Sequence, residues 1–94
     1  MNTRINYLRL AERFWELHDR FSFESNDVMA YFFLLNASNK LQKKIFTIWD
    51  KDLKAVCGVS MSVLMKSLRF IQETGLIQFE NVDKDVTKFT IIQN

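Results

Sequence analysis

The chain has 94 residues, of which 48% are hydrophobic and 14% are aromatic, and its formal net charge is +2. This length supports one small hydrophobic core, which excludes a multidomain enzyme, and the composition excludes a disordered protein. The absence of proline and the presence of only two glycines predict helices with few irregular loops. A single cysteine, no secretory signal and no apolar run of bilayer length predict a cytoplasmic protein.

The first predicted helix runs from about Thr3 to His18 and carries two neighbouring apolar stripes. One stripe would cover a small core. The second therefore indicates either a wide core face or a helix that packs partly on its own domain and partly on another copy of the chain. The first stripe supplies our candidates for an oligomer interface, and the second lies beside it. The first stripe contains Tyr7, Leu10, Phe14, Leu17 and Phe21, of which the first four are the candidates, and the second contains Leu8, Ala11 and Trp15.

A second helix is predicted from an N-cap at Ser25 to about Leu41. Asp27 lies in its first turn, where a carboxylate is favourable against the helix dipole. The run from Val28 to Leu35 leaves no polar face, so we expect this helix to be the central core helix, surrounded by protein. The β-branched and aromatic residues of 45–49 then predict a short strand.

The stretch from Asp52 to Ile77 has the spacing of two short helices joined by a tight turn. Gly58 can adopt a positive φ, and Ser60 is placed to cap the second helix. Gly75 ends that helix. The residues that point inward share helical spacing, and they are Leu64, Leu68 and Ile71, with Ser67 near the same side.

Two strands, 76–80 and 86–92, are predicted after the second helix, joined by a loop at 81–85. Alternation places Ile77 and Phe79 against Phe89 and Ile91 on an inner face. Together with the 45–49 strand, this hairpin completes a small three-stranded sheet.

The predicted fold is therefore mainly α with a small β-hairpin, a winged helix-turn-helix of order α-α-β-α-α-β-β. It occupies residues 1–94 as a single domain. Its parts are an N-terminal helix and connection (1–24), a helical core (25–75) with the helix-turn-helix at 51–74, and a wing hairpin (76–92).

Positive charge is concentrated in the middle of the sequence. Residues 40–69 carry seven Lys and Arg against two Asp, a balance of +5, whereas residues 1–39 and 70–94 carry −1 and −2. The excess falls where phosphate contacts by a helix-turn-helix are expected. The alternative interpretation is a solvated lysine face.

The outer face of the second helix of the motif supplies the candidate DNA contacts. We expect Met61, Val63 and Met65 to point outward as well, and these offer few donors to base edges. With the two carboxylates of the predicted wing tip at 83–85, they favour a protein partner as the alternative. The candidate DNA-binding residues are Ser60, Ser62, Val63, Lys66 and Arg69, with Lys51 and Lys84.

Catalytic chemistry has few candidate residues in this sequence. His18 is the only histidine and Cys57 the only cysteine, so a zinc site within one chain is excluded. Cys57 lies where such motifs bury a small apolar residue. Two glycines cannot form a Walker-type phosphate loop. We therefore expect no enzyme, no metal and no cofactor.

The order of three segments resembles a known family. They are FWELHDRFSF at 14–23, SNDVMAYFFLLN at 25–36, and DLKAVCGVS at 52–60 leading to GLI at 75–77. In this order they resemble the N-terminal winged-helix domain of phage and mobile-element replisome organisers, relatives of the DnaD-type primosomal proteins. The resemblance implies a domain that binds double-stranded DNA or self-associates, as a homodimer or higher oligomer, while replication machinery assembles at an origin.

The leading hypothesis is thus a DNA-binding winged helix in replication initiation or primosome assembly of a phage or mobile element. A protein interaction and oligomerisation module of a replication complex is the first alternative. A transcription regulator is the second.

Overall fold

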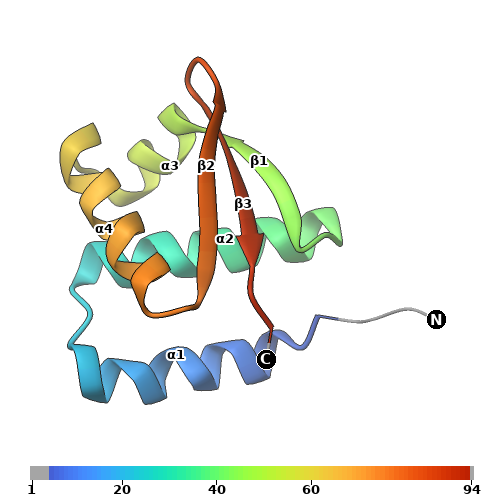
Figure 1. Ribbon diagram of the computed structural model, residues 1–94, viewed down its shortest axis with the longest axis vertical. Helices are drawn as coiled ribbons and strands as arrows, with labels where there is room; N and C mark the ends of the chain where they lie inside the picture. Colours follow the sequence, from blue (N-terminus) through green and yellow to red (C-terminus); the bar gives the residue numbers. More distant parts are fainter. Residues whose placement is uncertain (1–4, 94) are drawn as a thin grey trace.

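The computed structural model describes residues 5–93. Its fold is mainly helical with one three-stranded antiparallel sheet (Figure 1). No helix in the described range is long and apolar enough to cross a membrane. The elements are α1 (Tyr7–Phe21), α2 (Ser25–Leu41), β1 (Ile45–Trp49), α3 (Asp50–Cys57), α4 (Met61–Glu73), β2 (Ile77–Asp83) and β3 (Val86–Ile91).

The first two helices differ from prediction at their ends. Thr3 lies outside the described residues, and α1 begins at Tyr7 because the Asn6 side chain accepts a hydrogen bond from the Arg9 N–H at 3.0 Å. It extends to Phe21 rather than ending at His18. Ser25 is the first residue of α2, not its cap. Glu24 occupies the N-cap position, and its N–H donates to Asp27 Oδ2 at 2.9 Å.

The sheet has the strand order β1-β3-β2, with both pairings antiparallel. Phe89 on the central strand faces Phe46 on one side and Phe79 on the other, with ring centroids 6.2 and 6.1 Å apart. This aromatic row lies on the inner face, which α2 crosses (Figure 1). The predicted inner residues Ile77 and Ile91 are fully buried beside it, so the predicted alternation of the hairpin is confirmed.

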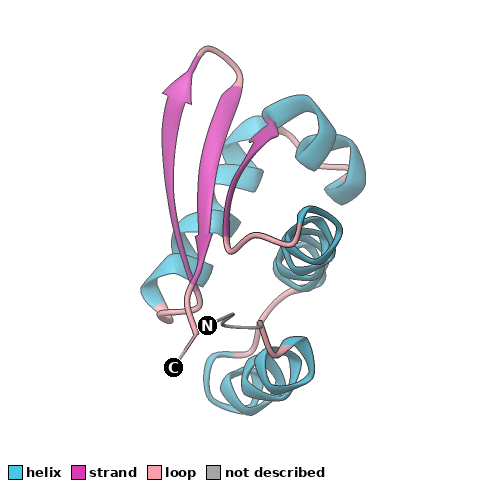
Figure 2. Cartoon of the chain, turned by 90° about the vertical axis from the view of Figure 1, so that its right-hand side faces the viewer, coloured by secondary structure: helices cyan, strands magenta, loops and turns pink. Residues whose placement is uncertain are grey.

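The hairpin is longer than predicted and extends past the helices (Figure 2). The strands continue to Asp83 and resume at Val86, so the turn contains only Lys84 and Asp85. A two-residue turn requires a residue with positive φ, and Asp85 supplies it at 63°. An irregularity in the pairing between Asn81 and Asp83 absorbs the change in register.

The core is built around α2, which buries Tyr31 and Leu34 completely. The prediction that the first half of α2 has no exposed side is wrong at one position, because Met29 is exposed. The side of α2 that carries Met29 is covered only in part, since Val28, Phe32 and Phe33 are half-buried. The sheet and the other helices do not enclose the whole circumference of α2.

The predicted oligomer interface is wrong for Leu10 and Phe14. These residues are 3% and 0% exposed, because the stripe that carries them fills the chain's own core. Tyr7 and Leu17 pack against the same core, and the Tyr7 hydroxyl lies 3.1 Å from Ser38 Oγ. The second stripe of α1 is the exposed one. Leu8 is 73% exposed and Trp15 48%, whereas Ala11 is half-buried.

The buried hydroxyl of Tyr31 gives a test of this packing. Within residues 5–93 it has no hydrogen-bond partner, and burial raises the pKa of Tyr31 far above its usual value. An unsatisfied buried polar group costs about 1–3 kcal/mol. Tyr31→Phe is therefore expected to raise the free energy of unfolding by about 1 kcal/mol in urea titrations.

Tyr7→Phe is the matched control, because it removes the same atom from a hydroxyl that is bonded to Ser38. We expect it to lower the free energy of unfolding by about 1 kcal/mol. Destabilisation by both changes would contradict the packing described for Tyr31.

Candidate nucleic-acid interface

The exposed side of α4 is a polar stripe. Ser62, Lys66 and Arg69 stand at positions i, i+4 and i+7, so they point in one direction, and all three are exposed. The opposite side is fixed by the buried Leu64, Leu68 and Ile71, while Ser67 is buried and accepts from Asn26 Nδ2 at 3.0 Å. The structure therefore brings these three candidate residues together.

The outward placement predicted for Met61 and Met65 is wrong. Both are half-buried and pack against the core. The reason is that they stand at i and i+4 on the same ridge as the buried Leu68, so the buried face of α4 is wider than its three inward residues indicate. Val63 is exposed, as predicted. The face of α4 that solvent can reach is thus more polar than the sequence indicated.

Two further features limit this face. The exposed Glu73 stands four residues after Arg69, so it ends the cationic stripe with a carboxylate. Ser60 is the N-cap, and its Oγ accepts from the Val63 N–H at 3.4 Å and lies 3.3 Å from Ser62 Oγ. The predicted cap is confirmed, and the Ser60 hydroxyl already has a structural role.

Lys51 and Lys84 lie near a different feature, which we call the joint, where the hairpin turn meets the start of α3. The Asp50 N–H donates to the Asp85 carbonyl at 2.9 Å, and the Thr87 hydroxyl donates to Asp50 Oδ1 at 2.6 Å. These bonds attach the hairpin to α3. Lys84 follows Asp83 in the turn, with its N–H donating to Asp83 Oδ1 at 2.7 Å.

Trp49 belongs to this joint and was missed from the sequence. It is 54% exposed, and Lys51 Nζ lies 5.8 Å from the centroid of its ring. Strand alternation contained the signal, because Phe46 and Ile48 point inward and Trp49 therefore points outward. An exposed ring beside a cation is a surface on which a nucleic-acid base can stack.

The basic segment 40–69 does not form one patch. Lys40, Lys43 and Lys44 lie at the end of α2 and the approach to β1, which Figure 1 places on the opposite side of the molecule from α4. On the exposed face of α4 itself, the cationic residues are Lys66 and Arg69. The basic residues of this segment are therefore close in the sequence but are not gathered at one place on the surface.

The residues considered for catalysis have structural surroundings. Cys57 is buried, and burial, followed by the charge of Asp27, raises the pKa of its thiol. His18 Nδ1 accepts from the Phe23 N–H at 3.0 Å, which holds the connection between α1 and α2. Across residues 5–93, no group of three or more His, Cys, Asp or Glu side chains is placed to hold a metal ion.

Comparison with known proteins adds no family to this geometry. No protein-family model matches the chain, and no curated protein and no solved structure is significantly similar to it.

The two serines at the start of α4 are expected to differ in role. Ser60→Ala should lower the free energy of unfolding by about 1 kcal/mol, because it removes the cap. Ser62→Ala should change it by less than about 0.5 kcal/mol, since this side chain is exposed. Thermal unfolding of both variants measures the difference. Equal losses would contradict the capping role of Ser60.

Proposed function

We propose that this chain is a DNA-binding winged-helix domain that acts in replication initiation or primosome assembly of a phage or mobile element. The support from the fold is a helix pair, α3 and α4, followed by an antiparallel hairpin attached to the start of that pair. The observation that carries the proposal is the polar stripe on α4. In a helix-turn-helix, the outer face of the second helix is the part presented to the major groove.

In this proposal, the exposed face of α4 contacts mainly the phosphate backbone of the DNA. Lys66 and Arg69 are long cationic side chains that reach phosphates or guanine edges, and Ser62 can donate to either. Val63 offers apolar contact to a thymine methyl group. Because Glu73 repels phosphates, binding is centred on the first three turns of α4. Lys51 and Lys84 add contacts from the joint of the hairpin.

The assignment to replication depends on the resemblance to the replisome organisers. A transcription regulator would use the same DNA contacts and differ only in the site it binds. Selection of bound duplexes from a pool of random sequences would identify the preferred DNA site, and this site would distinguish the two roles.

A second candidate function is self-association within a replication complex. It is favoured by the exposed Leu8 and Trp15, which stand seven residues apart on one side of α1. Met61 and Met65 do not support this second candidate function, since both are half-buried and pack against the core.

Duplex DNA titrations at several salt concentrations test the first proposal. We expect log Kd to change linearly with log salt concentration. The Lys66→Ala, Arg69→Ala double variant should reduce the slope by about one for each phosphate that the variant no longer binds. The Lys40→Ala, Lys44→Ala double variant is the control, because it removes the same charge from the end of α2 and the approach to β1, away from α4.

This control separates a local site from general attraction. No binding of the wild type at low salt would overturn the proposal. Equal weakening by the two double variants would show attraction to net charge instead of a site on α4.

Light scattering over a range of concentrations tests the second candidate. We expect the mean mass to exceed that of a monomer at high concentration, and Leu8→Gln to abolish the increase because it places an amide in the apolar contact. Val82→Thr, at an exposed position of β2, should have no effect. A wild type that stays monomeric throughout would eliminate this candidate.

A further inference from the structure

A row of arginines follows one side of α1. Arg9, Arg13, Glu16 and Arg20 stand at positions i, i+4, i+7 and i+11, which places them on a single stripe. With Leu17 they line a shallow pocket of about 310 Å³. We call these four residues the arginine stripe.

The linear charge balance hides this stripe. Residues 1–39 carry −1 in total, but two of the acids on α1, Glu12 and Asp19, belong to the neighbouring stripe that contains Leu8 and Trp15. Within the arginine stripe, three guanidinium groups meet one carboxylate. The arginine stripe therefore carries a local excess of positive charge, although the net charge of residues 1–39 is negative.

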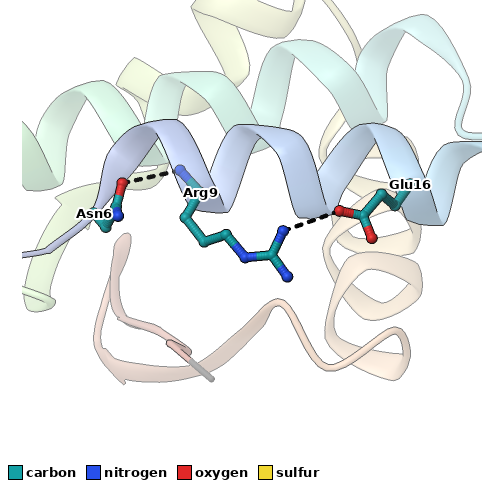
Figure 3. A network of polar contacts seen from close by, with 3 residues as sticks. All are labelled: Asn6, Arg9 and Glu16. Atoms are coloured by element: carbon teal, nitrogen blue, oxygen red, sulfur yellow. Dashed lines mark hydrogen bonds and ion pairs between the residues drawn. The ribbon is translucent and has the colours of Figure 1, made fainter.

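The ion pair between Arg9 and Glu16 shows that the stripe can bind an anionic group. Arg9 extends along the helix so that its Nη1 lies 3.1 Å from Glu16 Oε1 (Figure 3). The two side chains are 56% and 63% exposed, so water and salt weaken this ion pair strongly. A phosphate can therefore replace the Glu16 carboxylate as the partner of Arg9 at a small cost in free energy.

The stripe runs beside the end of α4. Arg20 lies 5.7 Å from the centroid of the Phe21 ring, and Phe21 contacts Phe70 edge to face at 6.3 Å. Phe70 directly follows Arg69 of the α4 face. Farther along α1, Arg13 reaches the turn after α4, since its Nη2 lies 3.8 Å from where a Cβ on Gly75 would be. The exposed Phe21 ring adds an apolar surface next to the Arg20 guanidinium group.

The dimensions of the stripe fit a polyanion better than a single ion. Its arginines span ~16 Å along the helix axis, from the rise of 1.5 Å per residue. Guanidinium groups match phosphate oxygens with two parallel hydrogen bonds, and a row of them fits an anion that repeats along a chain. The adjacent aromatic ring suits a nucleic acid more than an acidic peptide, because a base can stack on it.

We propose that the arginine stripe of α1 binds the sugar-phosphate backbone of a nucleic-acid strand, as a contact surface separate from the outer face of α4. This inference extends the proposed function, since it gives a nucleic-acid-binding chain a second contact surface.

The test is an NMR titration of the full chain with a ten-residue oligothymidine and with a short duplex. The backbone amides of residues 9–20 and the arginine Nε–Hε signals report on the stripe, and the amides of residues 62–69 report on α4. We expect the stripe signals to shift, and Arg20→Gln to weaken the affinity measured at them about fivefold. Arg13 is left unchanged, because it lies near Gly75 and the buried Tyr31.

A pair of charge-matched variants sharpens the test. Glu16→Gln removes the carboxylate from the stripe and is expected to raise its affinity several-fold. Asp19→Asn removes the same charge from the neighbouring stripe and is expected to have a smaller effect. Equal effects of the two variants would overturn the proposal, because net charge alone would then explain binding.

The two sets of signals separate this proposal from the proposed function. If only residues 62–69 shift, the proposed function stands and the arginine stripe is not a binding surface. If only residues 9–20 shift, the stripe binds and the role given to α4 is wrong. A glutamate-rich peptide that shifts the stripe signals at lower concentration than the oligothymidine would overturn the nucleic-acid assignment.

Discussion

The packing of Phe14 is the interaction on which the rest of this structure depends. Its ring is fully buried and stacks on Phe23 at 4.5 Å and on Tyr31 at 4.9 Å, and it meets Phe32 edge to face at 5.3 Å. One side chain thus joins α1, the connection and α2. Phe23 in turn contacts Phe70 of α4 at 5.4 Å. Aromatic pairs have preferred geometries, so this cluster fixes the rotation of α1 as well as its position.

That rotation decides what α1 offers to partners. With Leu10 and Phe14 turned inward, one flank exposes Leu8 and Trp15 and the other carries the arginine stripe. The sequence contained both apolar stripes, but it could not tell which one faced the core. Which stripe faces the core depends on where the other helices and strands pack against α1. Tertiary packing decides this, and helical periodicity alone does not. The same limit explains Met29, which is exposed in a run with no polar face.

The site was predictable to the extent that it follows local geometry. The turn at Gly58, the cap at Ser60 and the inward residues of α4 follow from backbone sterics and helical spacing. The same spacing predicts the outward placement of Lys66 and Arg69. The half-burial of Met61 and Met65 could not be predicted, because the width of the buried face depends on which elements pack against α4, and both α2 and α3 do so. Lys40 and Lys44 belong to the same basic segment of the sequence as Lys66 and Arg69, but the end of α2 lies on the opposite side of the molecule from α4.

The two flanks of α1 have consequences for each other. Self-association through Leu8 and Trp15 would also bring together Glu12 and Asp19 of the same stripe from two copies, and like charges at close range oppose that contact. Salt weakens this repulsion, and it weakens phosphate binding by the arginine stripe as well. The proposed self-association and the proposed nucleic-acid binding would therefore use neighbouring sides of α1 and respond to salt in opposite directions. The two proposed contacts would then not compete for the same surface of α1, so a nucleic acid on the arginine stripe would leave Leu8 and Trp15 exposed.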